Sequence, residues 1–347
     1  MSEGQGAPRR LVVFGVTGQL GQELVERLDE SGWPIAELVG VASSESVGTT
    51  FSFRGEELDV QGEWPVLKGR DLVFLCTRGA PALEIVRECL RAEVACLDLT
   101  GALSGQAEVP MAFGVGEAPS AEQIAAAPLL VTPSGTALAW AAVLGALQGA
   151  GPVRRVVGTV LSSASALGRK GLVALSEESI ALFNQSAVPD PGPAGQTVAF
   201  DVVPAGGVEV DRVRQELARA FGAGLAVDLA AVQIPAFVGE GSMLSIEFEA
   251  PVAQGDLEAQ LEASEELTRV LEGFGSRGLE AVDDTGPVPS GPTLRDAAGA
   301  DGILVGPLEP DSSLTEGQGW RLWIVSDPLR VVAEQAVRLA GRRLGLE

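Results

Sequence analysis

Short apolar runs alternate with amphipathic segments over the first third of the chain. Residues 10–16 are an apolar, β-rich run that ends in glycine. In residues 19–31 the leucines at 20, 24 and 28 recur at helical spacing, which predicts an amphipathic helix. Similar patterns predict four more strands and one more helix, at 35–42, 71–76, 94–99 and 128–132, and at 80–92. Strands that alternate with helices are typical of a parallel sheet with right-handed crossovers, so residues 1–133 are predicted to form a doubly wound α/β domain.

The pattern changes after residue 133. It predicts a helix of small apolar residues at 136–150, a strand at 153–163 and a helix at 170–184, followed by a loop rich in Pro and Gly. Further strands are expected at 197–203, 226–238, 243–249, 303–308 and 320–326, and further helices at 209–222 and 255–274. These elements predict a second α/β domain with a mixed sheet over residues 134–327. An amphipathic helix with Pro328 in its first turn is predicted for residues 328–347.

Composition and charge narrow the classes of partner. Hydrophobic residues make up 46% of the chain and the mean hydropathy is +0.24, which suffices for two cores and excludes wholesale disorder. No apolar run approaches the ~18 residues of a membrane span, and the first residues do not resemble a signal peptide. The formal net charge of −23 repels phosphate backbones and anionic lipids, so neither nucleic acid nor a membrane is an expected partner.

The missing residue types exclude several chemistries. The chain has no His and no Tyr. Without His, Ser-His and Cys-His catalysis and His-ligated metal sites are excluded, and no metal site is predicted. The three thiols, Cys76, Cys89 and Cys96, lie in apolar surroundings without a CxxC motif. This usage is typical of small core residues and predicts a reducing, cytoplasmic compartment without disulfides.

A glycine-rich turn, residues 15–21 with the sequence GVTGQLG, follows the first predicted strand. Glycines at this spacing let a pyrophosphate approach the backbone, and the helix N-terminus that follows supplies amide donors and a positive dipole. The candidate cofactor-binding residues of the turn are Gly15, Thr17, Gly18, Gln19, Leu20 and Gly21. The alternative is a tight turn that needs glycine for packing alone.

The end of the second predicted strand is the candidate ribose site. The hydroxyls of Ser43 and Ser44 would bond a ribose hydroxyl or a 2′-phosphate. Glu45 would repel such a phosphate, and the next arginine along the chain is Arg54. NAD and NADP therefore both stay open as cofactors, with Glu45 favouring NAD. The other interpretation is a Ser/Gly loop without a ligand.

Two acidic pairs are the remaining candidates for chemistry. Glu177 and Glu178 lie on a predicted helix, and Glu247 and Glu249 lie on a predicted strand. Carboxylates in pairs can serve as acid/base groups or hold a metal. Solvated helix faces and strand edges are the alternative explanation.

Several motifs, in their order along the chain, resemble those of the aspartate-semialdehyde dehydrogenase family. GVTGQLG resembles the family's GATGAVG, and ASSESVG resembles its ASERSAG. In the second half, VTPSGTALAW is similar to NPNCTTIQLV, AFDVVPAGG to AFNVIPHIG, and WIVSDPLR to WVVSDNLR. The resemblance implies a Rossmann-type NAD(P)-binding domain, a second domain that forms a homodimer, and a C-terminal helix packed back on the first domain. The implied reaction is the NADP-dependent reductive dephosphorylation of aspartyl phosphate in amino-acid biosynthesis.

The sequence departs from the family pattern at the catalytic and substrate-binding positions. Gly135 stands where the family has its nucleophilic cysteine, and Glu240 stands where it has its histidine base. Four further positions lose a glutamine or an arginine of the family, namely Leu161 and then Gln233, Ser104 and Glu45. Without a thiolate no thioester can form, and without the arginines the clamps for carboxylate and phosphate are lost. The chain therefore resembles the family's non-canonical relatives that lack the catalytic cysteine.

Three functional hypotheses follow. The first is a catalytically silent homodimer that binds NAD or NADP and acts as a binding or regulatory protein, with a small-molecule ligand still to be identified. The second is a working NAD(P)-dependent oxidoreductase in which Glu240 acts as acid and base on a substrate that needs no covalent intermediate. The third is a scaffold that has lost nucleotide binding.

Overall fold

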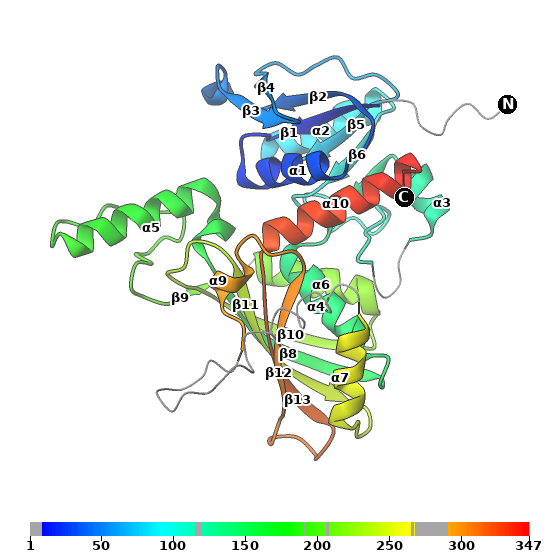
Figure 1. Cartoon of the computed structure of the whole chain (residues 1–347), viewed down its shortest axis with the longest axis vertical. Coiled ribbons are helices and arrows are strands. Elements are labelled where there is room, and N and C mark those ends of the chain that lie inside the picture. The colour runs from blue at the N-terminus through cyan, green and yellow to red at the C-terminus, as the bar shows by residue number, and fades with distance from the viewer. Residues whose placement is uncertain are drawn as a thin grey trace. The chain divides into compact units, whose positions relative to one another are not determined.

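The computed structural model describes residues 9–114, 119–190, 192–205, 208–264, 267 and 291–346 of the 347 in the chain. Contacts between residues divide the chain into two units, both drawn in Figure 1. The first unit contains residues 9–114, 119–134 and 332–346, and the second contains the described residues between 135 and 331. The last helix, α10 (Pro328–Leu344), runs from the second unit into the first.

A five-stranded parallel sheet forms the core of the first unit (Figure 1). Its strands, in spatial order, are β2 (Ile35–Val41), β1 (Arg9–Phe14), β5 (Leu72–Leu75), β6 (Ala95–Asp98) and β7 (Leu129–Val131). Every residue of β5 is buried, as expected of a parallel strand covered on both faces. The strand order reverses beside β1, and in doubly wound sheets such a reversal marks the ligand-binding edge. The five strands predicted for this part of the chain are confirmed.

Helices α1 (Gln19–Glu30), α2 (Ala80–Arg91) and α3 (Ala121–Ala126) belong to the same unit. The amphipathic pattern of α1 is confirmed, because Leu24, Val25 and Leu28 are its buried apolar side chains. The hairpin of β3 (Thr50–Phe53) and β4 (Glu56–Asp59) was not predicted, since three of the four residues of β4 are acidic and form no apolar run.

The C-terminal part of α10 makes specific hydrogen bonds within the first unit. The Gln335 side-chain amide donates to the carbonyl of Ala112 at 2.9 Å. The Arg343 guanidinium donates to three carbonyls at the end of α3, those of Ile124, Ala125 and Ala127. These carbonyls have no acceptor role inside α3, so Arg343 satisfies the end of that helix.

The second unit is built on a six-stranded mixed sheet. Its strands, in spatial order, are β12 (Ile303–Pro310), β13 (Gly319–Ser326), β11 (Glu240–Phe248), β8 (Val153–Ser162), β10 (Ala226–Gln233) and β9 (Val203–Ala205). β8 and β10 pair in parallel, and the other neighbours pair antiparallel. The predicted fold class, a doubly wound parallel sheet with a second α/β unit built on a mixed sheet, is therefore confirmed.

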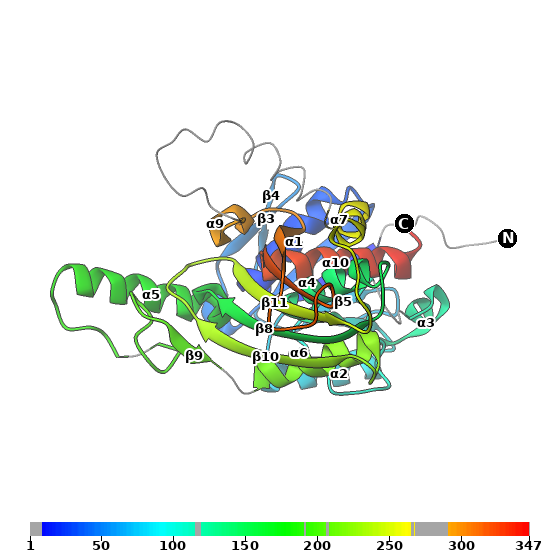
Figure 2. The ribbon, with the colours of Figure 1, turned by 90° about the horizontal axis from the view of Figure 1, so that it is seen from below.

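Helices α4 (Gly135–Leu147) and α6 (Val208–Phe221) pack against β8 and β10, α7 (Gln254–Ala263) packs against α4, and α9 (Leu294–Ala297) is short. α4 is buried almost entirely, and its Trp140 indole donates to the Ser242 hydroxyl of β11 at 3.0 Å. A short turn, η2 (Ala164–Leu167), leads into α5 (Gly168–Phe183). In Figures 1 and 2, α5 extends away from the sheet as an arm.

The strand predicted at 197–203 is wrong, because β9 covers only Val203–Ala205. The backbone amides of Val198 and Ala199 donate instead to the carboxylate of Glu178 on α5, at 2.8 and 3.0 Å. A side chain therefore satisfies this backbone where a strand partner was expected.

Two further predicted elements end earlier than their patterns indicated. The strand predicted at 226–238 ends at Gln233, after which the chain turns toward the loop before β11. The helix predicted at 255–274 corresponds to α7, which ends at Ala263. Most of the remaining part of that prediction lies outside the described residues.

Candidate functional site

The glycine turn joins the end of β1 to the start of α1. Gly15 has a φ of +89°, and a Cβ there would lie 2.9 Å from the carbonyl carbon of Cys76. A Cβ on Gly21 would lie only 2.2 Å from the carbonyl oxygen of Gly15. Both glycines are therefore required to let α1 pack against the end of the sheet.

Gly18 differs from the other two glycines of the motif. It precedes α1, is exposed and has an extended backbone with φ −74° and ψ 158°. A Cβ on Gly18 would meet nothing closer than the Gly15 oxygen at 3.2 Å, so packing does not demand glycine there. The missing side chain leaves the first amides of α1 open to a ligand, and these amides have no acceptor within the helix.

One buried acceptor next to the turn also has no partner. Oε1 of Gln19, the first residue of α1, is buried and has no hydrogen bond to any residue that the structure describes. A buried acceptor without a donor is costly, and a donor on a bound ligand would satisfy it. The glycine cradle with its open amides, which are donors, is the feature that fits the pyrophosphate of a bound dinucleotide.

The candidate ribose loop lies against the same turn. The amides of Gly15 and Val16 donate to the carbonyl of Val41 at the end of β2, at 2.7 and 3.2 Å. A short helical turn, η1 (Ser44–Ser46), follows β2, and Ser46 Oγ lies 3.2 Å from Thr17 Oγ1 within hydrogen-bond distance. The structure thus brings the predicted pyrophosphate and ribose residues together. Ser43, Ser44 and Glu45 are exposed on the loop.

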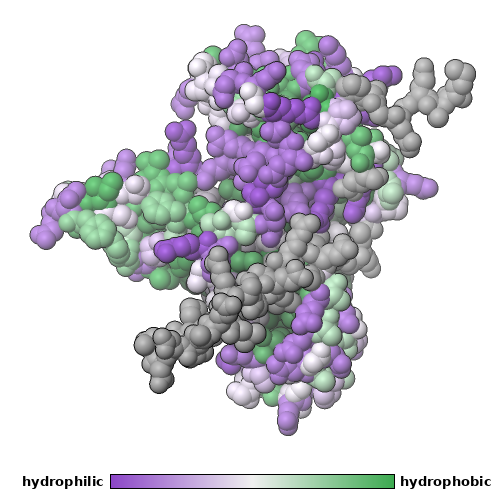
Figure 3. All heavy atoms as spheres, viewed as in Figure 1, coloured by the Kyte–Doolittle hydropathy of each residue, from purple (hydrophilic) through white to green (hydrophobic). Residues whose placement is uncertain are grey.

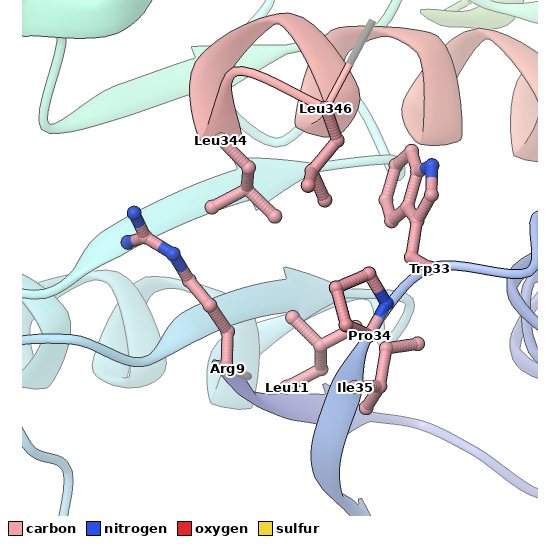
Figure 4. A pocket seen from close by; sticks show the side chains of 7 residues that line it. All are labelled: Arg9, Leu11, Trp33, Pro34, Ile35, Leu344 and Leu346. Carbon is pink, nitrogen blue, oxygen red and sulfur yellow. The ribbon is translucent and has the colours of Figure 1, made fainter. Parts of the chain in front are cut away.

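A pocket of the first unit lies at the opposite edge of the sheet. It is lined by Arg9, Leu11, Trp33, Pro34, Ile35, Leu344 and Leu346 (Figure 4). Arg9 and Ile35 are the first residues of β1 and β2, so this pocket is at the amino ends of the strands. Ligands of doubly wound sheets bind at the carboxyl ends, so the pocket is not part of the candidate site.

Glu240 lies at the centre of a buried polar cluster in the second unit. It begins β11 and is 7% exposed. The Thr136 hydroxyl donates to Glu240 Oε1 at 2.7 Å, and the Ser162 hydroxyl donates to Oε2 at 3.3 Å. Burial raises the pKa of Glu240 to about 7, against the lowering effect of the two hydroxyls. Nearby Glu209 adds to the rise.

Gly135, at the position of the family's nucleophile, has no room for a side chain. It begins α4, and a Cβ built on it would lie 2.5 Å from Pro328 Cβ. The Cα and the carbonyl oxygen of Pro328 would each be 2.6 Å away. The first residue of α10 therefore occupies the space where a cysteine side chain would begin.

Of three other positions aligned with family site residues, Gln233 lies in the Glu240 cluster, whereas Leu161 and Ser104 do not. Gln233 is buried and donates through Nε2 to the carbonyl of Ser162 at 2.9 Å, so it joins the Glu240 cluster. Leu161 pairs with Gly241 and faces the opposite side of the sheet from Ser162, because side chains alternate along a strand. Ser104 is buried in the first unit, in the turn after β6.

Sequence reasoning did not identify Thr136 and Ser162, the two hydroxyl donors to Glu240. Each directly follows a position at which the family motif is broken, Gly135 and Leu161. A polar residue next to a lost catalytic position was the one feature of the sequence that could have pointed to them. That these two hydroxyls bind Glu240 is evident only from the structure.

The remaining candidates have structural roles. Burial raises the pKa of the Cys76 thiol far above its ordinary range, and a hydrogen bond with Cys89 together with burial raises that of Cys96. Neither thiol supplies a thiolate near neutral pH. Glu247 forms ion pairs with Arg154 and Arg155 at 3.3 and 3.8 Å.

Two absences hold for the part of the chain that the structure describes. Its Cys, Asp and Glu residues form no group of three that could hold a metal ion. None of its helices is long and apolar enough to cross a membrane.

Comparison with known proteins bears on the first unit directly. Residues 10–126 match the family described as semialdehyde dehydrogenase, NAD binding domain. The first unit is thus similar to a semialdehyde dehydrogenase NAD-binding domain. The glycine turn and the serine loop both fall within this match.

Matches over nearly the whole chain support an aspartate-semialdehyde dehydrogenase-like protein. The chain is 25% identical to the aspartate-semialdehyde dehydrogenase of Synechocystis over 349 residues, which cover 96% of this chain and 97% of that one. It is 28% identical to the USG-1 protein homolog of Pseudomonas aeruginosa, with 97% and 98% covered. Aspartate semialdehyde dehydrogenase II of Vibrio cholerae, 23% identical, has the same fold, with a TM-score of 0.83 and coverage of 97% and 98%.

Proposed function

We propose that this semialdehyde dehydrogenase homologue binds NAD or NADP, is catalytically silent toward aspartate semialdehyde, and acts in the cytoplasm as a dimeric binding or regulatory protein. The observation that carries the proposal is the contact of Gly135 with Pro328. At the aligned nucleophile position a Cβ would lie 2.5–2.6 Å from three atoms of Pro328, two of which belong to the backbone. A side chain cannot move such atoms aside without moving the start of α10.

Glu240 supports the same conclusion. Both of its oxygens already accept hydrogen bonds, from Thr136 and Ser162, and its side chain is almost wholly buried. The family's reaction needs a thiolate to form the adduct from which hydride leaves, and a carboxylate does not replace it. The cluster thus resembles a packed, hydrogen-bonded core more than an open substrate-binding site.

Nucleotide binding is supported separately, by the first unit. A dinucleotide bound there would supply a nicotinamide ring as hydride carrier. The chain's own part is to bind and orient it: the α1 amides would bond the pyrophosphate, and the serine loop would bond the ribose. Gly18, which packing does not require, is the residue that keeps this approach open.

The test combines binding with activity. Calorimetric titration of the full chain with NAD and with NADP is expected to show binding of at least one of them. Gly18→Val should weaken it at least about tenfold, because the isopropyl group stands where the phosphates approach. Gly105→Val is the matched control, since a Cβ at Gly105 meets nothing within 4 Å. Equal weakening by both variants, or no binding by the parent chain, would refute the nucleotide site.

The same protein, supplied with aspartate semialdehyde, phosphate and NADP, is expected to give no NADPH above the blank. A pKa of about 7 is the observation that favours the alternative, in which Glu240 acts as acid and base of a working oxidoreductase. Turnover that disappears in Glu240→Gln would establish that alternative and end the silent interpretation.

The proposed dimer rests on an apolar surface of the second unit. We define the arm patch as five exposed side chains of α5 and the segment before β9, namely Val173, Ile180, Phe183, Phe200 and Val202. Phe183 is 75% exposed and Phe200 is 65% exposed, and their rings meet edge-to-face at 5.3 Å. Figure 3 shows hydrophobic side chains gathered along this arm. Such a surface is typical of an interface, and the family resemblance indicates a second copy as its cover.

Light scattering at micromolar concentration is expected to give a mass of about twice the chain's 35.7 kDa. Phe183→Asp combined with Phe200→Asp should give monomers, because two carboxylates would be buried at the interface. Leu83→Asp is the control, an exposed apolar residue of α2 in the first unit, 44% exposed. A monomeric parent chain would exclude the dimer.

A further inference from the structure

We propose that the serine loop recognises an unphosphorylated ribose, so that the chain binds NAD in preference to NADP, with Glu45 as the residue that sets the preference. This inference rests on the proposed nucleotide site and specifies its ligand. The observation behind it is a carboxylate that pairs with no cation among the described residues, on a loop held beside the glycine turn.

The position of Glu45 is that of a ribose-reading residue. β2 lies next to β1 in the sheet, and η1 begins three residues after β2 ends at Val41. In doubly wound nucleotide-binding folds, an acidic residue roughly 20 positions beyond the glycine motif bonds the ribose 2′-hydroxyl. Where a 2′-phosphate is bound, an arginine takes that role. Glu45 lies in this region and is acidic, as in the folds that bind an unphosphorylated ribose.

The loop that carries Glu45 is held in place. The Ser46 amide donates to the carbonyl of Ser43 at 2.9 Å, and the Thr49 hydroxyl donates to the carbonyl of Ser46 at 2.7 Å. The hydrogen bond between Thr17 and Ser46 joins the loop to the glycine turn. These contacts hold the backbone that carries Glu45 beside the glycine turn.

The charge around Glu45 is not compensated. Glu45 is exposed and forms no hydrogen bond or ion pair with the residues that the structure describes. Arg54, the next cation along the chain, is bound to the carbonyl of Trp33 and lies over the ring of Phe53. Its backbone amide is bonded to Asp29. Arg54 is thus held at the hairpin and at the segment before β2, and is engaged away from the loop.

Two described cations of the neighbouring elements β1 and α1 are paired with acidic residues, and Arg78 lies beyond β1. Arg10 pairs with Asp71 at 3.2 Å, and Arg27 pairs with acidic residues of its own helix. Arg78 follows β5, which flanks β1 on the side away from β2. A 2′-phosphate bound at the serine loop would therefore lie near the Glu45 carboxylate without a cation to offset its charge. Two negative charges a few ångströms apart repel each other even in water.

Ser43 and Ser44 are the opposing feature, because their hydroxyls can donate to a phosphate as well as to a ribose hydroxyl. Neutral donors of this kind serve both cofactors. Glu45, in contrast, accepts a hydrogen bond from the 2′-hydroxyl and repels the phosphate. The carboxylate therefore decides the preference.

Calorimetry with four probes tests this assignment: NAD, NADP, AMP and adenosine 2′,5′-bisphosphate. NAD is expected to bind at least about tenfold more tightly than NADP at low salt, and AMP more tightly than the bisphosphate by a similar factor. Added salt should reduce both ratios, since the repulsion is between exposed charges. The two shorter probes isolate the ribose region from the rest of the dinucleotide.

Two variants and one control complete the experiment. Glu45→Gln should bring the NAD/NADP ratio close to one, and Glu45→Arg should invert it. Glu57→Gln removes the same charge from an exposed position of β4 and should leave the ratio unchanged. Equal or tighter binding of NADP by the parent chain overturns this inference alone, as does an unchanged ratio in Glu45→Arg. Failure of all four probes to bind overturns the nucleotide site and this inference together.

Discussion

Gly135→Cys is expected to destabilise the protein by about 3 kcal/mol and to restore no dehydrogenase activity. The new Cβ would lie 2.5 Å from Pro328 Cβ and 2.6 Å from the Cα and carbonyl oxygen of the same residue. Two of these three atoms are backbone, and the proline ring fixes φ at the start of α10. The clash therefore cannot be relieved by turning a side chain, and either α4 or α10 must shift.

Urea denaturation of the variant against the parent chain measures the loss. Gly255→Cys is the matched control, because Gly255 also lies in the first turn of a helix of the second unit. A Cβ there meets nothing within 4 Å, so no loss is expected. A Gly135→Cys variant as stable as the control would show that α10 moves aside at little cost. The argument that Pro328 excludes a side chain at position 135 would then be refuted.

Activity should stay absent even where the cysteine is tolerated. The start of α4 favours a thiolate at position 135, but no described residue supplies a base for it: the chain has no His, and Glu240 is a buried acid already bonded to Thr136 and Ser162. Burial without a cation raises the pKa of a thiol and disfavours the thiolate. Formation of NADPH by Gly135→Cys, with aspartate semialdehyde and phosphate, would contradict this expectation.

The second large effect is a loss of stability as the pH rises to about 7, caused by Glu240. The pKa of Glu240 is raised in the folded state from 4.5 to about 7, so between these values the folded protein holds a proton that the unfolded chain releases. The protonated form is the favoured one inside the fold. Stability from this group is therefore greatest below about pH 4.5, falls by about 3 kcal/mol between about pH 4.5 and about pH 7, and levels off above pH 7, where both states are ionised.

Glu240→Gln should flatten this dependence, because the amide keeps the size of the acid and never ionises. Above about pH 7 the variant is expected to be more stable than the parent chain. Glu247→Gln is the control, on the same strand but paired with Arg154 and Arg155. Urea unfolding over this pH range gives the answer, and an unchanged slope in Glu240→Gln would show that Glu240 is ionised throughout in the folded protein.

Much of the first unit is readable from the sequence because its signals are local. The apolar runs at 10–16, 35–42 and 71–76 became buried parallel strands, since strands covered on both faces need continuous apolar sequence. The glycine motif is also local: Gly15 requires a positive φ, and Gly21 touches a backbone atom of the same turn. Interactions between residues this close along the chain leave a pattern that the order of amino acids alone displays.

Elements whose partners are distant were predicted less well. The segment at 197–203 has the apolar pattern of a strand, yet its amides bond the buried Glu178 carboxylate. The pattern of Glu177 and Glu178 predicted a solvated helix face, with an acid/base or metal site as the other interpretation, whereas Glu178 is buried. No local rule shows that one of two adjacent acids turns inward to hold a backbone 20 residues away.

The sequence by itself determined the plan of two α/β units, the position of the glycine turn, and the loss of Cys and His at the positions where the resembling family has them. Only the tertiary structure shows which residues surround these two positions. Pro328 fills the space beside Gly135 although the two lie far apart along the chain, and Thr136 and Ser162 reach Glu240 across 104 and 78 positions. Contacts of this range leave no periodicity in the sequence, because they depend on how helices and strands pack once each has formed.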